Sequence, residues 1–286
     1  MYATDPIRKL LDEYPEKSGA HRWHQPKGDG DTRPIAVPDK ELREWLRKMN
    51  KALSKKFSAW PEFMHGGIKK RSYVSYARPH VGKACVVTID IKKCFDSITQ
   101  HEIATALKRH LNFDDETSAR LAELLCFNGR LPQGFPTSNY LCNIYLLGPL
   151  VELHGRLKAN GVQLSNYVDD LALSGNKLIA DEIVNEVAVA LSRAKLKMNK
   201  AKVSVMAASQ PQVICGLLVN KRLSLTRSLK LELLSDIASG RMSDSSAEGW
   251  VAHLHSIDPT FALKFYAYAV KKGVLKGTEA TQQAAR

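Results

Sequence analysis

The feature that most constrains this chain is a pair of adjacent aspartates inside an apolar run. Asp169 and Asp170 lie in the stretch NYVDDLALSG (166–175), which contains no basic residue. Neighbouring carboxylates repel each other, and burying either one without a partner is costly. Two acids followed by apolar residues also lack the glycine or asparagine of an ordinary hairpin turn. The pair therefore needs compensating positive charge, which need not come from the protein itself.

A third aspartate ends another apolar run. Asp90 closes ACVVTIDI (84–91), which predicts a buried strand, and QLSNYVDDLALSG (163–175) predicts a β-hairpin with the acidic pair at its tip. If both belong to one sheet, three carboxylates converge at its edge. Such hard oxygen ligands suit Mg²⁺ or Mn²⁺. Two such ions about 4 Å apart can activate a hydroxyl and stabilise a leaving pyrophosphate.

The rest of the chain mixes helices and strands without a strict βα alternation, which predicts the α+β class. Thr99 and Glu102 form a capping-box pattern that opens one helix. Hairpin or strand patterns cover 24–39, 202–208 and 212–220. Helical patterns cover 6–14, 40–58, 99–111, 114–127, a long segment after 135, 179–196 and most of the chain from 225.

The charge balance points to a polyanionic partner. The 286 residues include 42 Lys and Arg against 29 Asp and Glu, a formal net charge of +13, which favours nucleic acid over a membrane surface. The five cysteines form no CxxC pair, which argues against zinc and a disulfide framework. The amino-terminal segment has no apolar h-region and no long apolar run exists, so we expect a cytoplasmic protein with no membrane partner.

Three motifs in order resemble those of reverse transcriptases. YVDD (167–170) is similar to their polymerase motif, VVTIDIKKCFDSI (86–98) to their first aspartate motif, and LPQGFPTSNYLCNIYL (131–146) to their nucleotide-pocket motif. The resemblance implies a right-hand polymerase. Residues 1–224 would form fingers and palm, and residues 225–286 a short helical thumb that binds RNA or duplex.

The resemblance also assigns catalytic residues. Asp90, Asp169 and Asp170 would hold two Mg²⁺ ions, with Mn²⁺ as an alternative, and the carbonyl of Ile91 would lie beside them. LKMNKAKVSV (196–205) resembles the following motif, in which a lysine donates a proton to the departing pyrophosphate. Lys202 is the first choice for this lysine, and Lys200 is the second.

A nucleotide pocket follows from the same resemblance. PKGDGDTRPIAVP (26–38) is similar to the fingers hairpin of bacterial reverse transcriptases, in which Lys27 and Arg33 would hold the triphosphate of an incoming dNTP. Phe95 matches the aromatic residue that blocks a ribose 2′-OH, although core packing is the alternative. Gln133 and Gly134 match residues over the nascent base pair.

Two further elements indicate the retron branch of the family. ICGLLVN (214–220) resembles the primer-grip hairpin, with Gly216 as its tight point. YARPH (76–80) occupies the place of a retron element that carries an asparagine where this chain has Tyr76, and Ile214 and Cys215 replace Val and Thr of the second element. His80 is expected either to contact RNA or to be a buried structural histidine.

A retron enzyme would recognise a structured noncoding RNA, begin DNA synthesis from an RNA 2′-OH and produce a branched RNA–DNA molecule. The resemblance implies a role in anti-phage defence with a separate effector protein. One alternative is another bacterial defence reverse transcriptase, of the abortive-infection or solitary type. A second is a catalytically idle RNA-binding component, against which the three intact aspartates argue.

Overall fold

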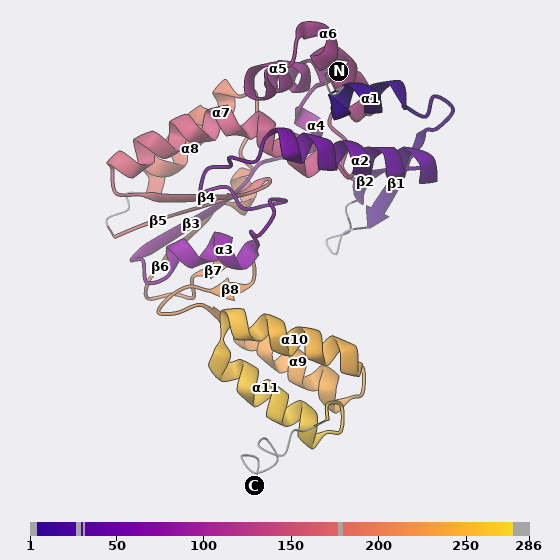
Figure 1. Ribbon diagram of the computed structural model, residues 1–286. Coiled ribbons are helices and arrows are strands. Elements are labelled where there is room, and N and C mark those ends of the chain that lie inside the picture. The colour runs from indigo at the N-terminus through magenta and orange to yellow at the C-terminus, as the bar shows by residue number, and fades with distance from the viewer. Residues whose placement is uncertain (1–4, 27–29, 31, 177–179, 277–286) are drawn as a thin grey trace.

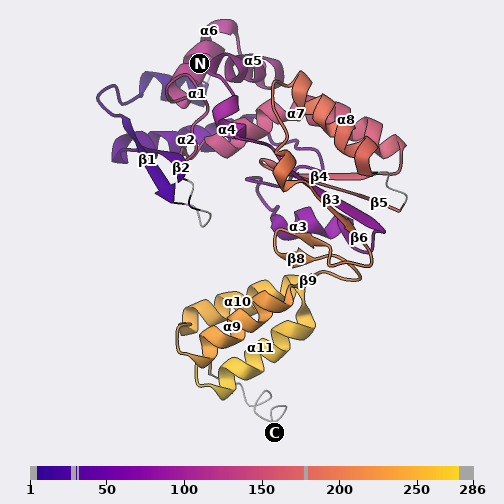
Figure 2. The ribbon, with the colours of Figure 1, turned by 180° about the vertical axis from the view of Figure 1, so that it is seen from behind.

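The computed structural model describes residues 5–26, 30, 32–176 and 180–276. Figures 1 and 2 show a central sheet with a layer of helices on one side and a small sheet on the other, followed by a carboxy-terminal group of helices. The predicted α+β class is confirmed. Among the described residues, no helix is both long and apolar enough to cross a membrane.

The helices differ widely in length. They are α1 (Pro6–Asp12), α2 (Lys40–Lys56), α3 (Tyr73–Ala77), α4 (Cys94–Ser97), α5 (Gln100–Leu111), α6 (Asp115–Leu125), α7 (Ser138–Ala159), α8 (Ala180–Arg193), α9 (Arg227–Ala238), α10 (Asp244–Ile257) and α11 (Pro259–Lys271). Two single 3₁₀ turns, η1 (Arg78–His80) and η2 (Lys200–Lys202), lie in connecting segments. The sequence patterns predicted the longer helices but not α3 and α4.

The central sheet carries the acidic residues. It contains β3 (Cys85–Asp90), β4 (Gln163–Tyr167), β5 (Asp170–Gly175) and β6 (Ser204–Ala207) in the order β4-β5-β3-β6, with every neighbouring pair antiparallel. Alternate residues of its two central strands enter two different hydrophobic clusters. Ile89 and Leu171 join the larger cluster under the helices, whereas Val86 and Ala172 join the smaller one. Both faces are thus covered, which explains the near-continuous apolar sequence of these strands.

A separate two-stranded hairpin lies beside α2. It consists of β1 (Ala20–Pro26) and β2 (Thr32–Pro38), as the sequence predicted for 24–39. Nearly all of β1 is exposed, whereas Ala36 and Pro38 of β2 are buried. The hairpin is therefore anchored through its second strand.

The carboxy-terminal part begins with a small three-stranded sheet, β7 (Val213–Ile214), β8 (Leu217–Leu218) and β9 (Ser224–Leu225). Helices α9, α10 and α11 follow, and side chains of Thr226, Ser243 and Asp258 cap their amino-terminal ends. The smaller hydrophobic cluster runs from this sheet into the three helices. The helical segment predicted from 225 onward is thus present, and its core is continuous with the sheet that precedes it.

Candidate active site

The sheet brings the three predicted carboxylates to one edge. Asp90 is the last residue of β3, and the antiparallel register places it opposite Asp170, the first residue of β5. Asp169 lies in the turn before β5, and its carbonyl accepts a hydrogen bond of 2.9 Å from the backbone N–H of Ile91. The convergence expected from the sequence is therefore present.

The turn that carries Asp169 has an unusual backbone. Tyr167 pairs with Asp170, so Val168 and Asp169 alone form the connection between β4 and β5. Val168 has a φ of 58°, in the left-handed region that glycine prefers and that is costly for a β-branched residue. The side-chain amide of Asn166 donates a 2.8 Å hydrogen bond to the Val168 carbonyl and so holds this conformation.

Residues 63–66, which precede α3, pack against this turn. A Cβ atom added to Gly66 would lie 2.5 Å from Val168 Cγ2 and 2.6 Å from the Val168 backbone nitrogen. The Gly66 carbonyl accepts a 2.6 Å hydrogen bond from the side-chain amide of Asn143, on α7. The backbone of Asn166 pairs with Phe63 and His65 at 2.7 and 2.8 Å. The sequence interpretation missed Gly66 and Asn143 because both act on the turn through long-range contacts.

Positive charge at the site comes from the chain itself. Lys202 Nζ lies 3.0 Å from Asp90 Oδ1, and Asn199 Nδ2 lies 3.2 Å from Asp90 Oδ2. The hydrogen bond to Asp90 and the charge of its carboxylate raise the pKa of Lys202, so the ammonium form is favoured. Asn199 is a further residue that the sequence interpretation missed.

The other two carboxylates are less well compensated. Burial, followed by the nearby charges of Asp169 and Asp90, raises the pKa of Asp170 to about 6, although the charge of Lys202 opposes this effect. Burial also raises the pKa of Asp169, while the positive charges of Arg33 and Lys202 oppose that effect. The Asp170 side of the site therefore favours an additional proton or cation.

The side chains at this edge of the sheet have the right donor atoms to bind a divalent metal ion. In the described ranges, no group of three His, Cys, Asp or Glu side chains is arranged to hold a metal ion as it stands, and Asp90 is engaged by Lys202 and Asn199. However, carboxylate oxygens are the ligands that Mg²⁺ prefers, and burial together with the charges of Asp169 and Asp90 raises the pKa of Asp170, an effect that a bound cation would oppose. The donor set thus suits a hard cation.

A cavity of about 270 Å³ opens beside the acidic residues. Asp90, Asp170 and Lys202 line one part of it, and Tyr76 and Cys215 line another. The turn between β7 and β8 reaches this cavity through Cys215. The φ angles of Cys215 and of Gly216, which follows it in the turn, are 46° and 78°. Gly216 is thus the tight point that the sequence predicted, and no atom lies within 4 Å of the position of its missing Cβ.

The predicted nucleotide-pocket residues differ in their surroundings. Lys27 lies outside the described residues, whereas Arg33 is exposed on β2 and acts electrostatically on Asp169. The Gln133 carbonyl accepts a 2.7 Å hydrogen bond from the Ala36 backbone N–H. A Cβ on Gly134, whose φ is 112°, would lie 2.4 Å from the Ala36 carbonyl oxygen. Because Gly134 has no side chain, the backbone of β2 can lie directly against it.

Two predicted site residues lie in the interior. Phe95, on α4, is 7% exposed and belongs to the larger hydrophobic cluster. His80 has no exposed surface, and its Nδ1 lies 2.7 Å from the Ser174 hydroxyl oxygen. Burial lowers the pKa of His80 to about 3, so the ring is neutral. Of the two roles expected for His80, the structure shows that of a buried structural histidine, since none of its side chain is exposed for contact with RNA.

Comparisons with known proteins agree with this geometry. The family described as reverse transcriptase (RNA-dependent DNA polymerase) matches residues 25–230. The retron Se72 reverse transcriptase of Salmonella heidelberg is 28% identical over 177 residues, which are 60% of this chain and 46% of that protein. The retron Mx65 reverse transcriptase of Myxococcus xanthus is 29% identical over 251 residues, which are 81% and 58% of the two chains. The expected resemblance to bacterial retron reverse transcriptases is confirmed.

Solved structures share the fold. The structure of telomerase from Candida albicans in complex with a TWJ fragment of telomeric RNA superposes with a TM-score of 0.55 at 12% identity, covering 97% of this chain and 63% of that one. The likeness supports the predicted right-hand arrangement. The chain spans about half the length of the curated relatives described above.

Proposed function

The chain belongs to the reverse transcriptase family, and from that premise we propose that it synthesises DNA on an RNA template. The observation that carries the proposal is the register of β3 and β5, which sets Asp90 against Asp170 with Asp169 in the adjoining turn. Three carboxylates beside an open cavity and a basic residue suit the transfer of a nucleotide from a triphosphate.

In this proposal Asp90, Asp169 and Asp170 hold two Mg²⁺ ions, for which Mn²⁺ is an alternative, with the carbonyl of Ile91 beside them. When bound, these ions supply activation of the attacking hydroxyl and stabilisation of the leaving pyrophosphate. The strained turn at Val168 fixes the direction of the Asp169 carboxylate relative to the sheet edge.

Lys202 is the proposed proton donor. The Asp90 carboxylate keeps its ammonium protonated, which is the form that can donate. The side chain is 64% exposed, so a polyanionic triphosphate in the cavity can compete with Asp90 for it. Lys200, the second choice, is exposed, and its ammonium group makes no hydrogen bond or ion pair within the described part of the chain.

The proposed dNTP site lies between β2 and the acidic edge. Arg33, which already acts on Asp169, would orient the triphosphate together with Lys27. Gln133 and Gly134 would lie over the new base pair, where their contacts with Ala36 hold β2 in place. Phe95 would exclude ribonucleotides, and its packing in the core would make that barrier rigid.

The proposed template is the structured noncoding RNA of a retron. The names of the curated relatives and the motifs of the sequence support this choice. Priming from an RNA 2′-OH would give branched RNA–DNA, and the system would act in the cytoplasm in anti-phage defence with a separate effector protein. Residues 1–224 would be the fingers and palm and residues 225–286 the thumb, with Gly216 beside the primer.

Catalysis is tested by incorporation of radiolabelled dNTPs by the purified chain on a primed RNA template with Mg²⁺. The double variant Asp169→Asn/Asp170→Asn is expected to lose more than about 100-fold in rate, since even outer-shell partners of metal ligands contribute up to that factor. The matched control Asp181→Asn/Glu182→Gln removes two adjacent exposed acids on α8 and should retain activity. An active Asp169/Asp170 variant would overturn the assignment of the site.

The retron assignment is tested separately by sequencing nucleic acid that co-purifies with the chain. DNA joined to RNA through a 2′ branch is expected. Linear products alone, made by an active enzyme, would exclude retron-type priming and favour another bacterial reverse transcriptase.

A further inference from the structure

A second cavity, of about 260 Å³, lies between α5, α7 and the chain that follows α8. Figures 1 and 2 show these helices on the side of the central sheet opposite to α9–α11. Among the described residues, none that lines the cavity beside the aspartates also lines this one. It is therefore a separate place on the molecule.

The floor of this cavity is apolar and fixed. Tyr145 and Pro149 from α7 contribute to it, together with Ala106 from α5 and Ala194. The Tyr145 hydroxyl donates a 2.6 Å hydrogen bond to the Ala194 carbonyl, so the orientation of the ring is set before any ligand enters. A flat, half-buried aromatic side chain of this kind suits the face of a base or a sugar.

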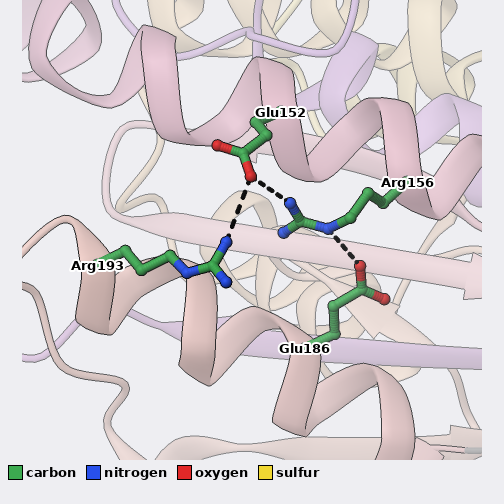
Figure 3. A network of polar contacts seen from close by, with 4 residues as sticks. All are labelled: Glu152, Arg156, Glu186 and Arg193. Carbon is green, nitrogen blue, oxygen red and sulfur yellow. Dashed lines mark hydrogen bonds and ion pairs between the residues drawn. The ribbon is translucent and has the colours of Figure 1, made fainter.

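The rim of the cavity is cationic, and two of its cations are held by acids. Lys195 Nζ lies 3.3 Å from Glu102 Oε1, and the other oxygen of Glu102 is occupied by Thr99 in the capping box. Figure 3 shows how Arg193 is held: its Nη1 lies 3.4 Å from Glu152 Oε1.

The acid that holds Arg193 is itself part of a network. Glu152 also pairs with Arg156, whose Nε lies 2.9 Å from Glu186 Oε1 on α8 (Figure 3). The network joins α7 to α8 beside the cavity. Arg193 is thus positioned at the rim by contacts that do not use the cavity itself.

Arg109 is the third cation and differs from the other two. No hydrogen bond or ion pair joins its guanidinium to another residue in the described parts of the chain, and its Nη1 lies 3.7 Å from the position of a Cβ on Gly148. Against Arg109, Arg193 and Lys195, the lining contains one carboxylate, Glu102. Since Arg193 is paired with Glu152 and Lys195 with Glu102, Arg109 leaves one uncompensated positive charge at the cavity, on a planar donor that matches a phosphate.

We propose that this cavity binds one nucleotide of an unpaired RNA segment. The phosphates flanking that nucleotide contact Arg109, Arg193 and Lys195, and its base or sugar lies on Tyr145. The inference rests on the proposed function in one respect, namely that the nucleic-acid partner is RNA. The volume of the cavity is just below the usual range for small-molecule sites, about 300–1,000 Å³, so it leaves room for no more than one nucleotide. A base within a duplex is stacked and paired and does not enter a hollow of this size.

The binding test compares Arg109→Gln with the matched control Arg47→Gln, which removes an exposed arginine on α2. Affinity is measured by fluorescence anisotropy with a labelled unpaired 20-nucleotide RNA of mixed sequence. We expect Arg109→Gln to weaken binding about 10-fold, the usual effect of losing a charge-assisted contact, and Arg47→Gln to weaken it less than about 3-fold. Equal losses in the two variants would overturn the proposal, because they would reflect overall charge alone.

The place of binding is tested by crosslinking. The same RNA with 4-thiouridine is expected to crosslink to peptides that contain Tyr145 or residues 101–110, and Arg109→Gln should abolish this crosslink. Its absence from wild-type protein would overturn the site. Displacement by AMP or inorganic phosphate at equal phosphate concentration would reassign the cavity to a free nucleotide or anion. Equal crosslinking of the corresponding DNA would overturn the choice of RNA.

Neither unfolding of the variant nor loss of polymerase activity would produce the same results in these two binding tests. Arg109 has no described partner to lose, so Arg109→Gln is expected to unfold at the wild-type temperature. Binding and crosslinking need no nucleotide incorporation. Failure of this proposal is therefore distinct from failure of the polymerase proposal, which the Asp169/Asp170 variant tests.

Discussion

The three aspartates at the edge of the sheet have different surroundings. Both oxygens of Asp90 have partners, Lys202 and Asn199, whereas Asp170 lies opposite Asp90 with its pKa raised to about 6 by burial and by the neighbouring acids. The adjacent pair is tolerated because Lys202 supplies one positive charge and because Asp170 accepts a proton readily. Binding of a further cation would relieve the repulsion at Asp170 directly.

Gly66 is expected to be essential for the position of the Asp169 carboxylate. In Gly66→Ala the new methyl group meets backbone atoms of Val168 and Tyr167 at 2.6 and 2.9 Å, so the turn must shift. A displacement of about 1 Å at a reacting group can cost on the order of 100-fold in rate. We expect dNTP incorporation to fall by that order through kcat, while KM for dNTP and RNA affinity change little.

The control for Gly66→Ala is Gly155→Ala. Gly155 lies on α7 with no atom within 4 Å of its missing Cβ, so the substitution should leave activity unchanged. Circular dichroism verifies that both variants are folded. A Gly66→Ala protein with wild-type kcat would show that the turn can move without consequence.

His80 is expected to make folding sensitive to acid. Its pKa is lowered to about 3 by burial, against 6.5 for an ordinary histidine, so below pH 6.5 the unfolded chain binds a proton that the folded chain does not. This contribution to stability is complete above pH 6.5 and is lost as the pH falls toward 3, at up to about 1.4 kcal/mol per pH unit. His80→Asn should flatten the dependence of the unfolding free energy on pH between 4 and 6.5.

Urea denaturation at several pH values measures this dependence. The wild-type chain and His80→Asn should differ in slope below pH 6.5 and run parallel above it. Equal slopes in the acid range would mean that the ring is protonated in the folded state.

The sequence could predict which acidic side chains lie close together, but not which residues fix their positions. Asp90, Asp169 and Asp170 belong to contiguous motifs, and each lies at the end of an apolar run that predicts a strand, so the edge at which they meet could be expected. Gly66, Asn143 and Asn199 act across long separations in sequence, so no local pattern reveals them. For Gly134, the motif implied a place over the nascent base pair, and the close approach of Ala36 could not be read from it.

At the scale of elements, two tight turns border the acidic cavity, and each places a non-glycine residue at positive φ. Val168 precedes Asp169, and Cys215 precedes Gly216. Such conformations persist where the surrounding structure holds them, and they concentrate at functional sites. The hairpins themselves were predictable from short apolar runs and the polar residues between them, but α3 and α4 were not, because helices this short depend on tertiary contacts.

The turn between β7 and β8 offers a test of backbone strain. Both of its residues have positive φ, an arrangement for which Asn-Gly is the preferred sequence. Cys215→Asn is therefore expected to raise the unfolding free energy by a few tenths of a kcal/mol, up to about 1 kcal/mol. Gly216→Ala should lower it by about 1–2 kcal/mol, since space is open there but φ is 78°.

Chemical denaturation of the two variants measures whether the unfolding free energy rises in Cys215→Asn and falls in Gly216→Ala. Because no atom lies near the missing Cβ of Gly216, any loss in Gly216→Ala comes from the backbone. Stability equal to wild type in Gly216→Ala would show that this turn is free to change its type.

At the scale of the whole molecule, the carboxy-terminal helices are joined to the sheet edge by a small set of contacts. The Tyr73 hydroxyl, on α3, is hydrogen-bonded to His253 on α10, and the Arg78 guanidinium donates a 2.9 Å bond to the Ser256 carbonyl. The smaller hydrophobic cluster continues from Tyr76 and Ile214 into these helices. Tyr76 and Ile214 also line the acidic cavity, so we expect a movement of the α9–α11 group to change the shape of that cavity.

Weakening these contacts is expected to affect long products more than single additions. The double variant Tyr73→Phe/Arg78→Gln removes both hydrogen bonds between the α3–η1 segment and α10 while leaving the aspartates untouched. If the α9–α11 group holds the growing duplex, the variant should dissociate more often at each step. We expect a several-fold fall in mean product length when released template is trapped, with the rate of the first addition within about 2-fold of wild type, since hydrogen bonds contribute about 1 kcal/mol each. Arg241→Gln, which breaks an ion pair with Asp236 within the helical group, is the matched control and should leave product length unchanged. A double variant with wild-type product length would show that the hydrophobic cluster alone fixes the position of these helices.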